Sequence, residues 1–561
     1  MTVDAVVVGS GPGGAAAAHV LTQAGWTVTI VEKGSNHLID PEPPFSLRQD
    51  YSNDEIKFVS RWFLGPDPLA EPRTFRRGVE DGERLFSGEV NSIPCTVGGG
   101  GVHADGKVPR FREEDFVLHS TLGPVADAAV ADWPLGYDEL EPFYAEAERL
   151  IGVAGDAAAN PFAAWRSGRY PMPPGPAMYG AVLSSAAAER VGLHPYPAPT
   201  AANSVEYGGR PACNDCGFCA WFGCPVHAKG DPVALLQRAL STGKAELMAD
   251  TFVARLVVDG RRVSGVEVVA AGGEHRTIGA RHVVLAAGAV ETPRLLKLSG
   301  IEHPLVGRCL MTHFQTIAYG TFEADLHPER GRAVTHVHDD AVLVDADARR
   351  AAADAGLPWL RGGMVEHSGP ALPVGEAKRY PWGRTHKRLM AESPMRRHLW
   401  AFTMQGEDLP QLTNTVDLDP VVRDARGFPV ARITYRPHRH EVAASAHHQL
   451  RLVQTLEEMG AQSTGVVTIP SVPGEVGWDG IRSAAPDSHH VMGTCRMGDD
   501  PTEAVVDAFG RVHGFDNLVV ADSSVFVTSA GYGPTLTLVA LAIRAAAALA
   551  GSDPLQGGAV E

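Results

Sequence analysis

The chain has 561 residues, 44% of them hydrophobic, and a mean hydropathy of −0.07, which suits a globular protein of two or three domains. Its net charge of −17 argues against nucleic acid and anionic membranes as partners; it would suit a cationic substrate, although acidity usually serves solubility. Seven cysteines do not make a secreted disulfide framework, and no apolar run is long enough to span a bilayer. Residues 3–8 already resemble a core strand and leave no room for a signal peptide, so we expect a cytoplasmic protein.

Residues 1–34 are predicted to form a strand, a glycine-rich turn, a helix and a second strand. The run VDAVVVG is continuously apolar, as in a parallel strand buried on both faces. Gly9, Gly11 and Gly14 match G-x-G-x-x-G directly after this strand, and Glu32 ends the next strand at the distance of a ribose-binding acid. Such glycines let the backbone approach a pyrophosphate at a helix N-terminus. The pattern predicts dinucleotide binding but does not choose between FAD and NAD.

Four cysteines gather between residues 213 and 225, in the run CNDCGFCAWFGCP. Their spacing approaches the ferredoxin run C-x2-C-x2-C-x3-C-P, with one extra residue before the last cysteine. An iron–sulfur cluster, a zinc ion, and inert or redox-active thiols all stay open as interpretations. The four residues are Cys213, Cys216, Cys219 and Cys224.

Strand-like runs occupy two further stretches of the chain. In residues 252–287 they are separated by the hairpin signals DG and GG. Residues 315–480 alternate polar and apolar positions, as in an antiparallel sheet covered on one face, and hold one clear helix at about 440–460. We therefore predict an α/β nucleotide-binding domain built from separated segments and interrupted by an α+β domain. The first comprises residues 1–50, 85–165, 206–312 and 480–561; the second, with surface excursions, comprises 51–84, 166–205 and 313–479.

Two C-terminal segments have the composition of a redox-pocket wall. SHHVMGTCRMG at 488–498 places a histidine beside a Gly-Thr turn, and GYGPTLTLVALAIR at 531–544 leads through a Gly-Pro step into an apolar helix. A histidine with a pKa near neutrality is a suitable acceptor for a hydroxyl proton. Because an alkoxide expels hydride more readily than an alcohol does, these segments predict alcohol oxidation.

Three further motifs resemble the glucose–methanol–choline (GMC) oxidoreductases, which are FAD enzymes that oxidise alcohols and sugars. These are VGGGGVHADGKVPRF at 97–111, GAVETPRLLKLSGI at 288–301 and GRVHGFDNLVVADSSVF at 510–526; Glu302 stands where the second pattern has a glycine. The resemblance implies a Rossmann-like FAD-binding domain and an α+β substrate domain with an antiparallel sheet that faces the flavin. It places Gly99, Gly100 and His103 along the flavin, Val253 near the adenine, and Asp522 at the ribityl–pyrophosphate region. Pro534 and Thr535 then begin a helix whose N-terminus points at the flavin pyrimidine and stabilises its anionic reduced form.

In this family the histidine of H-x-x-G-T takes the hydroxyl proton while hydride passes to flavin N5, and His490 matches that histidine. The family's second member is an Asn or His, at the position where this chain has Gly533. His489 is one substitute, although adjacent side chains of an extended segment point to opposite faces. Tyr532 is another, if the loop bends at Gly533. We favour the third, in which His490 works alone or with groups of the substrate and the glycine leaves space.

The resemblance also bears on two cofactor questions. Some sugar-oxidising relatives attach FAD covalently through a histidine in the segment that holds His103; the simpler interpretation is a side chain that contacts the flavin. Bacterial relatives that pass electrons to a cytochrome carry a comparable cysteine-rich insert with an iron–sulfur cluster. Such a cluster here would favour a dehydrogenase over an oxidase.

The sequence thus predicts FAD-dependent oxidation of an alcohol or sugar hydroxyl, and a glycoside or aminoglycoside is one specific substrate that the acidic charge and Gly533 favour. The electron acceptor, which is oxygen, a quinone or a redox protein, stays open. Two other functions remain: a redox-silent FAD lyase of the hydroxynitrile lyase type, and an electron-transfer subunit that uses the cysteine cluster.

Overall fold

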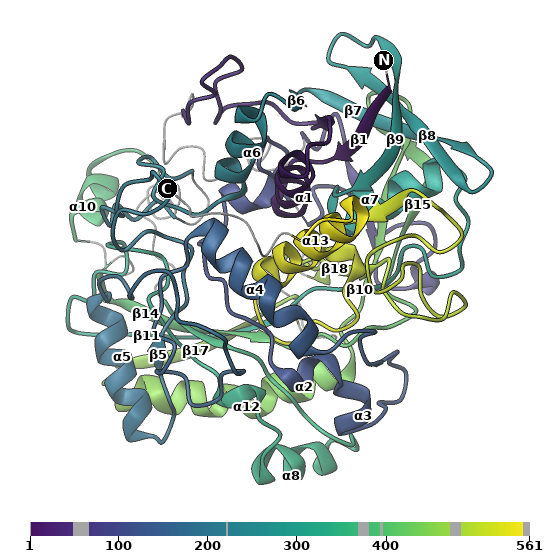
Figure 1. Cartoon of the computed structure of the whole chain (residues 1–561). Coiled ribbons are helices and arrows are strands. Elements are labelled where there is room, and N and C mark those ends of the chain that lie inside the picture. Colours follow the sequence, from purple (N-terminus) through teal and green to yellow (C-terminus); the bar gives the residue numbers. More distant parts are fainter. Residues whose placement is uncertain are drawn as a thin grey trace.

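A computed structural model describes residues 2–48, 67–91, 93–219, 223–368, 381–392, 397–471 and 484–553. Three sheets and the helices packed against them make up the fold (Figure 1). No helix in these ranges combines the length and apolarity needed to cross a membrane.

The first sheet is built around the predicted strand–helix–strand unit, which is confirmed. Its strand order is β6-β2-β1-β9-β8-β7, and β19 also pairs with β9. Five of its strands run parallel, while β7, β8 and β9 form the two antiparallel hairpins predicted for residues 252–287. The strands are β1 (Thr2–Val8), β2 (Val28–Val31), β6 (Ala245–Met248), β7 (Thr251–Asp259), β8 (Arg262–Ala270), β9 (His275–Leu285) and β19 (Leu518–Val520).

Helices pack against this sheet and against one another near the centre of the molecule (Figure 1). Helix α1 (Pro12–Gln23) lies between α6 (Pro232–Ser241) and α13 (Thr535–Ala550), and α13 also packs on α4 (Tyr137–Ile151). Alanines fill the contact face of α1, since residues 15–18 are all fully buried. Helix α7 (Gly288–Leu298) packs against β7.

The other two sheets are six-stranded. One has the order β18-β10-β15-β16-β3-β4 and the other, antiparallel throughout, the order β17-β11-β14-β13-β12-β5. The first comprises β18 (Met492–Thr494), β10 (Arg308–Met311), β15 (Thr415–Arg423), β16 (Pro429–Thr434), β3 (Arg73–Arg76) and β4 (Phe86–Gly88). The second comprises β17 (Ser463–Ile469), β11 (Phe314–Thr321), β14 (Leu399–Gly406), β13 (Val365–Ser368), β12 (His336–His338) and β5 (Tyr196–Pro197).

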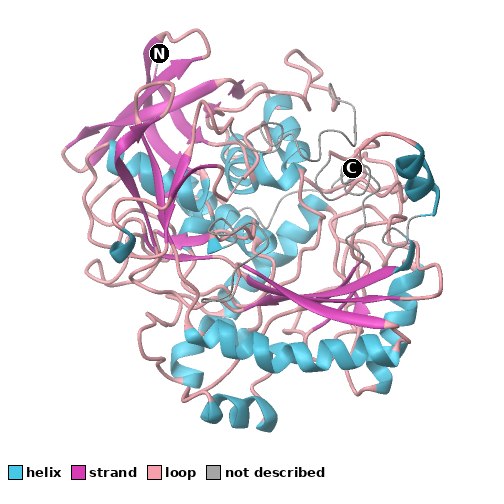
Figure 2. Ribbon diagram, turned by 180° about the vertical axis from the view of Figure 1, so that it is seen from behind, coloured by secondary structure: helices cyan, strands magenta, loops and turns pink. Residues whose placement is uncertain are grey.

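Helices α12 (Arg439–Glu458) and α5 (Tyr179–Arg190) cover one face of the antiparallel sheet (Figure 2). The predicted helix at 440–460 is α12, and the runs TNTVDLDP and PVARITYRP fall on β15 and β16. The architecture is therefore the predicted α/β nucleotide-binding fold joined to an antiparallel α+β part. The exact domain division stays a prediction, and residues 51–66 of it lie outside the described ranges. Shorter helices are α2 (Glu113–Phe116), α3 (Leu118–Leu122), α8 (Ala346–Asp354) and α10 (Arg384–Glu392).

Candidate active site

Four parallel strands deliver the predicted nucleotide-binding residues to one edge of the first sheet. Val8 pairs with both Val31 and Leu285, and Leu285 pairs with Val520, so the carboxyl ends of β1, β2, β9 and β19 are aligned. The residues that follow these ends include Gly9, Glu32 and Asp522. Ligands of open α/β sheets bind at this edge, beyond the carboxyl ends of the strands.

The glycine loop after β1 has the shape that a pyrophosphate needs. A Cβ on Gly11 would meet nothing within 4 Å, so its backbone is open to the space in front of α1. Gly14 is different, because a Cβ there would lie 2.0 Å from the Gly9 carbonyl oxygen. Gly9 itself has a φ of +100°, which L side chains rarely adopt. Gly11 thus allows a ligand to approach, whereas Gly9 and Gly14 allow the turn and helix to pack.

Two carboxylates are fixed beside this loop by backbone and hydroxyl donors. Glu32 accepts hydrogen bonds from the amide (3.0 Å) and hydroxyl (2.7 Å) of Ser10 and from the amide of Gly34 (2.9 Å). A carboxylate has about four acceptor positions, so Glu32 retains capacity for ribose hydroxyls. Asp522 accepts from the amide of Gly288 (2.9 Å) and the hydroxyl of Thr292 (2.6 Å).

A cavity of about 690 Å³ runs from the glycine loop to the antiparallel sheet. This volume lies in the range of cofactor and ligand sites. Gly14 and Tyr532 are absent from its wall; Gly14 instead supports the turn below it. The lining includes Gly9, Gly11, Glu32, Gly99, Gly100, His103, Val253, Asp522, Pro534, Thr535, His489 and His490. These residues suit FAD bound in an extended pose, and the covalent role of His103 stays a prediction.

The first turn of α13 also faces this cavity. Pro534 precedes the helix, Thr535 is its first residue, and both line the wall together with Leu538. Free N–H groups and the positive end of the helix dipole concentrate at such a terminus. The helix start is thereby suited to stabilise negative charge that develops on a ligand ring in the cavity.

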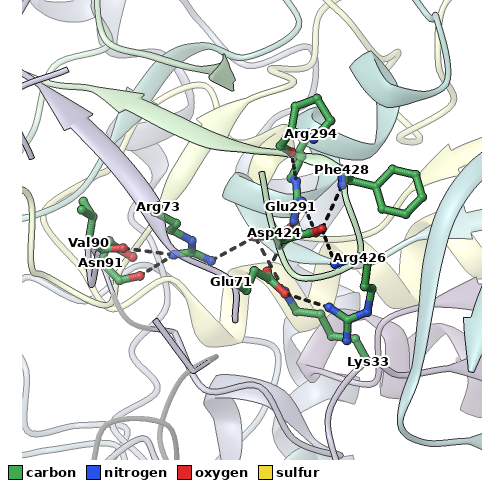
Figure 3. A network of polar contacts seen from close by, with 11 residues as sticks. Lys33, Glu71, Arg73, Val90, Asn91, Glu291, Arg294, Asp424, Arg426 and Phe428 are labelled. Atoms are coloured by element: carbon green, nitrogen blue, oxygen red, sulfur yellow. Dashed lines mark hydrogen bonds and ion pairs between the residues drawn. The ribbon is translucent and has the colours of Figure 1, made fainter. Parts of the chain in front are cut away.

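A network of buried ion pairs surrounds the end of the cavity near β2 (Figure 3). Arg294 of α7 contacts Asp424 at 2.7 Å, Glu291 at 3.1 Å and Glu71 at 3.4 Å. Lys33, which follows Glu32, contacts Glu71 at 2.5 Å. The network ties α7 and the end of β2 to the turn between β15 and β16, and removing one partner of such a buried pair typically costs about 3–5 kcal/mol. The network could not be predicted from the sequence, because Lys33, Glu71 and Asp424 are far from α7 in the chain.

His490 and His313 meet because two short strands pair in an antiparallel register. Met311 of β10 pairs with Met492 of β18, and continuing this register by two residues places His313 opposite His490. Their Nδ1 atoms are 2.8 Å apart, and the Nε2 of His313 lies 3.2 Å from the backbone carbonyl oxygen of Ser529. His313 belongs to none of the motifs recognised in the sequence and was not predicted from it.

The direction of donation along this chain of hydrogen bonds follows from the Ser529 carbonyl at its end. A carbonyl oxygen only accepts, so the Nε2 of His313 carries the proton. Burial lowers the pKa of His313 to about 4, so its ring is neutral at pH 7 and its Nδ1 is an acceptor. The Nδ1 of His490 must then be the donor. In neutral His490 this leaves Nε2 without a proton, and Nε2 has no hydrogen-bond partner within the described ranges.

Burial, together with His313, Lys107 and His489, lowers the pKa of His490 well below the ordinary imidazole value. His490 is therefore neutral at pH 7 and presents an unprotonated nitrogen on the cavity wall. Such a group can accept a proton from a hydroxyl placed in the cavity.

The three substitutes considered for the missing partner at Gly533 have different outcomes. Tyr532 does not line the main cavity; its buried side chain lines a separate cavity of about 40 Å³ beside Asp339. His489 does line the main cavity, since residues 489–490 precede β18 and the alternation of a strand does not apply to them. His490 hydrogen-bonds His313, a residue that is none of the three substitutes. Gly533 is buried and does not line the main cavity, and a Cβ there would make ordinary van der Waals contacts at 3.9 Å, one of them with Cε1 of His490.

The role of the cysteine run stays a prediction. In the described part of the chain, no group of three or more His, Cys, Asp or Glu side chains is arranged to hold an ion. Cys213, Cys216, Cys219 and Cys224 are all free thiols, and residues 220–222 between them lie outside the described ranges. Burial raises the pKa of Cys219 to about 12. No step of the chemistry below depends on a cluster.

Comparison with known proteins matches most of this chain. Residues 183–315 and 410–542 match the two models of GMC oxidoreductase, and residues 2–43 match an FAD binding domain. The 2-methyl-1,2-propanediol dehydrogenase of Mycolicibacterium austroafricanum is 29% identical over 97% of this chain and 94% of its own. The 6'''-hydroxyparomomycin C oxidase of Streptomyces lividus is 30% identical over 98% and 91%. The crystal structure of pyridoxine 4-oxidase from Mesorbium loti shares the fold, with a TM-score of 0.61, 19% identity and coverage of 97% and 98%.

Proposed function

Because the chain belongs to the GMC oxidoreductase family, whose members use FAD to oxidise CH–OH groups, we propose that its His490 accepts the proton of a substrate hydroxyl during oxidation to a carbonyl. The observation that carries the proposal is the chain of hydrogen bonds from Ser529 through His313 to His490. This arrangement leaves Nε2 of His490 as an unprotonated, basic nitrogen on the wall of the cavity that the nucleotide-binding residues also line.

The reaction divides into a proton and a hydride. Nε2 of His490 takes the hydroxyl proton, so that the lone pair left on oxygen can form the C=O bond. FAD, when bound along the cavity, supplies the acceptor for the hydride that leaves the substrate carbon. Nδ1–H of His490 donates a hydrogen bond to Nδ1 of His313, which keeps the ring oriented and leaves Nε2 unprotonated until it takes the hydroxyl proton. The N-terminus of α13 stabilises negative charge that develops beside it.

The substrate class that we favour is a glycoside or aminoglycoside. The glycine at 533 supports this class, because it lacks a side chain beside His490; a Cβ there would lie 3.9 Å from Cε1 of His490. A relative that matches 98% of this chain is named for the oxidation of hydroxyparomomycin C. The acidic charge of the chain suits a substrate that carries amino groups.

Anaerobic flavin reduction tests the function. The FAD-loaded protein would be mixed with primary alcohols, sugars and aminoglycosides, each paired with a deoxy analogue that lacks the reacting hydroxyl. We expect at least one sugar or aminoglycoside to bleach the flavin absorbance and its deoxy analogue not to. Cleavage of a hydroxynitrile without bleaching by any hydroxyl compound would instead establish the redox-silent lyase and refute the proposal.

A further inference from the structure

A row of polar side chains crosses the sheet wall of the cavity beside His313. Gln315 of β11 pairs directly with Gln405 of β14, and Glu366 lies on the adjacent strand β13. All three side chains line the cavity. The opposite face of β11 packs on α12, where Thr316 hydrogen-bonds Ser445. The row is therefore a feature of the ligand side of the sheet.

The orientation of each amide in the row follows from Glu366. Its carboxylate only accepts, so Gln405 must present Nε2, which lies 2.6 Å from Oε1 of Glu366. The carbonyl Oε1 of Gln405 then accepts from Nε2 of Gln315 at 3.0 Å. This leaves the carbonyl oxygen of Gln315 without a partner among the residues that the structure describes. An unpaired acceptor on a cavity wall calls for a donor on the ligand.

Two carboxylates of the same row share one cation, and burial raises the pKa of Glu366 against the opposing effect of that cation. The Lys107 ammonium contacts both Glu366 and Asp105, the latter at 2.9 Å. Burial lowers the pKa of Lys107, but the two carboxylates outweigh this and raise it, so Lys107 stays charged. Glu366 and Lys107 are both buried. An incompletely compensated charge in a buried wall is unfavourable, and a cation in the ligand would offset it.

We propose that Gln315, Gln405, Glu366 and Asp105 form a subsite for a protonated amino group of the substrate, so that the substrate is an amino sugar or aminoglycoside. This inference rests on the proposed function and deepens it. A hydroxyl would satisfy the carbonyl of Gln315, whereas an ammonium group also offsets the second carboxylate. Gln315 follows His313 by two residues of extended chain, roughly 7 Å, a span that one sugar ring with its substituents can bridge.

A pair of substrates that differ in one group tests the subsite. Methyl α-glucosaminide and methyl α-glucoside would be compared by kcat/KM in the wild type and in Glu366→Gln, Gln315→Met and Glu302→Gln. Glu302 is exposed and absent from the cavity wall, so its variant controls for the loss of one negative charge. We expect the ratio of kcat/KM for the amino over the hydroxy substrate to fall about tenfold or more in Glu366→Gln, as for a lost charged hydrogen bond. It should fall less in Gln315→Met and stay unchanged in Glu302→Gln.

A binding measurement separates this inference from the proposed function. Calorimetry would record binding of methyl α-glucosaminide to the FAD-loaded His490→Ala protein, with and without Glu366→Gln. Weaker binding in the double variant supports the subsite even if no sugar reduces the flavin. The proposal would be overturned if neither Glu366→Gln nor Gln315→Met changed the amino-to-hydroxy ratio of kcat/KM and Glu366→Gln did not change the binding constant of methyl α-glucosaminide.

Discussion

Nδ1 of His313 lies 2.8 Å from Nδ1 of His490, and the two rings are nearly perpendicular, at 89°. The contact joins residues 177 positions apart through the pairing of β10 with β18. It gives His490 a hydrogen-bonding partner in a chain that has glycine at 533. In the proposed mechanism His313 is a positioning residue that acts through His490.

Replacing His313 tests this role. In His313→Leu the Nδ1 proton of His490 loses its acceptor and the tautomer is no longer fixed, so we expect kcat to fall about 100-fold, within the range of general-base effects. His313→Asn retains an acceptor and should recover part of that loss. Flavin reduction kinetics would measure both, and ¹⁵N NMR of labelled histidine would show whether Nε2 of His490 remains the unprotonated nitrogen.

The matched control for this experiment is His338→Asn. His338 is also buried and contacts a second histidine, His367, at 2.9 Å, but it does not line the cavity. It should leave kcat unchanged. Equal losses in the His313 and His338 variants would mean that His313 acts through stability alone.

The pH dependence of kcat/KM should report the lowered pKa of His490. Burial lowers that pKa most, followed by His313 and Lys107. Because a lowered pKa keeps the imidazole neutral to lower pH, kcat/KM should stay level as the pH falls through 6.5 and decline only below it. An acid limb centred at or above pH 6.5 would contradict the assignment.

Replacing Lys107 is expected to shift the acid limb of the kcat/KM profile. Lys107→Met removes a positive charge and leaves Asp105 and Glu366 without their cation, so the pKa of His490 should rise and the acid limb should move to higher pH. Lys387→Met, at an exposed position of α10, should not move the limb. A profile unchanged by Lys107→Met would show that its charge does not reach His490.

Gly533 is expected to provide room for the substrate. Its φ lies outside the left-handed region and a Cβ would have 3.9 Å to its neighbours, so Gly533→Ala should fold and act like the wild type. In Gly533→Asn the longer side chain would enter the space beside His490. We expect kcat/KM for bulky glycosides to fall about tenfold, as for overpacking, with small primary alcohols little affected. Faster turnover of both glycosides and small alcohols would show instead that Gly533 lacks a catalytic side chain that asparagine restores.

Replacing Gly11 in the glycine loop is expected to weaken FAD binding without preventing folding. Gly11→Ala adds a methyl group that meets no protein atom but occupies the ligand space, so the apoprotein should fold while FAD affinity falls about tenfold or more. Gly136→Ala, also open to solvent but outside the cavity, should leave FAD affinity unchanged. Fluorescence titration of the apoproteins with FAD would measure the affinities, and an unaffected Gly11→Ala would place the pyrophosphate elsewhere.

The sequence predicted those parts of the site that follow from local patterns. Gly9, Gly11 and Glu32 belong to a contiguous strand–turn–helix–strand unit, and the structure places all three on one cavity. Asp522 and His490 could be located because recognised motifs hold them. In each case a short run of chain determines both the conformation and the position of the side chain.

His313 and the polar row could not be predicted in this way. They depend on the registers of β10 with β18 and of β11 with β14, which join residues far apart in the sequence. One signal was present: from His313 the alternate residues Gln315 and Ile317 face the cavity, a period of two that predicts a shared face of a strand. The direction of the Tyr532 side chain, an open alternative from sequence, depends on packing beside Asp339 rather than on sequence spacing.

The central claim, that His490 accepts the substrate proton, is tested most directly by chemical rescue of His490→Ala. Anaerobic stopped-flow would record the rate of flavin reduction by a substrate that bleaches the wild type. We predict a fall of about 10²–10⁴-fold with unchanged FAD content, and partial recovery with added imidazole that follows the fraction of neutral imidazole. Flavin reduction by His490→Ala at the wild-type rate would contradict the account.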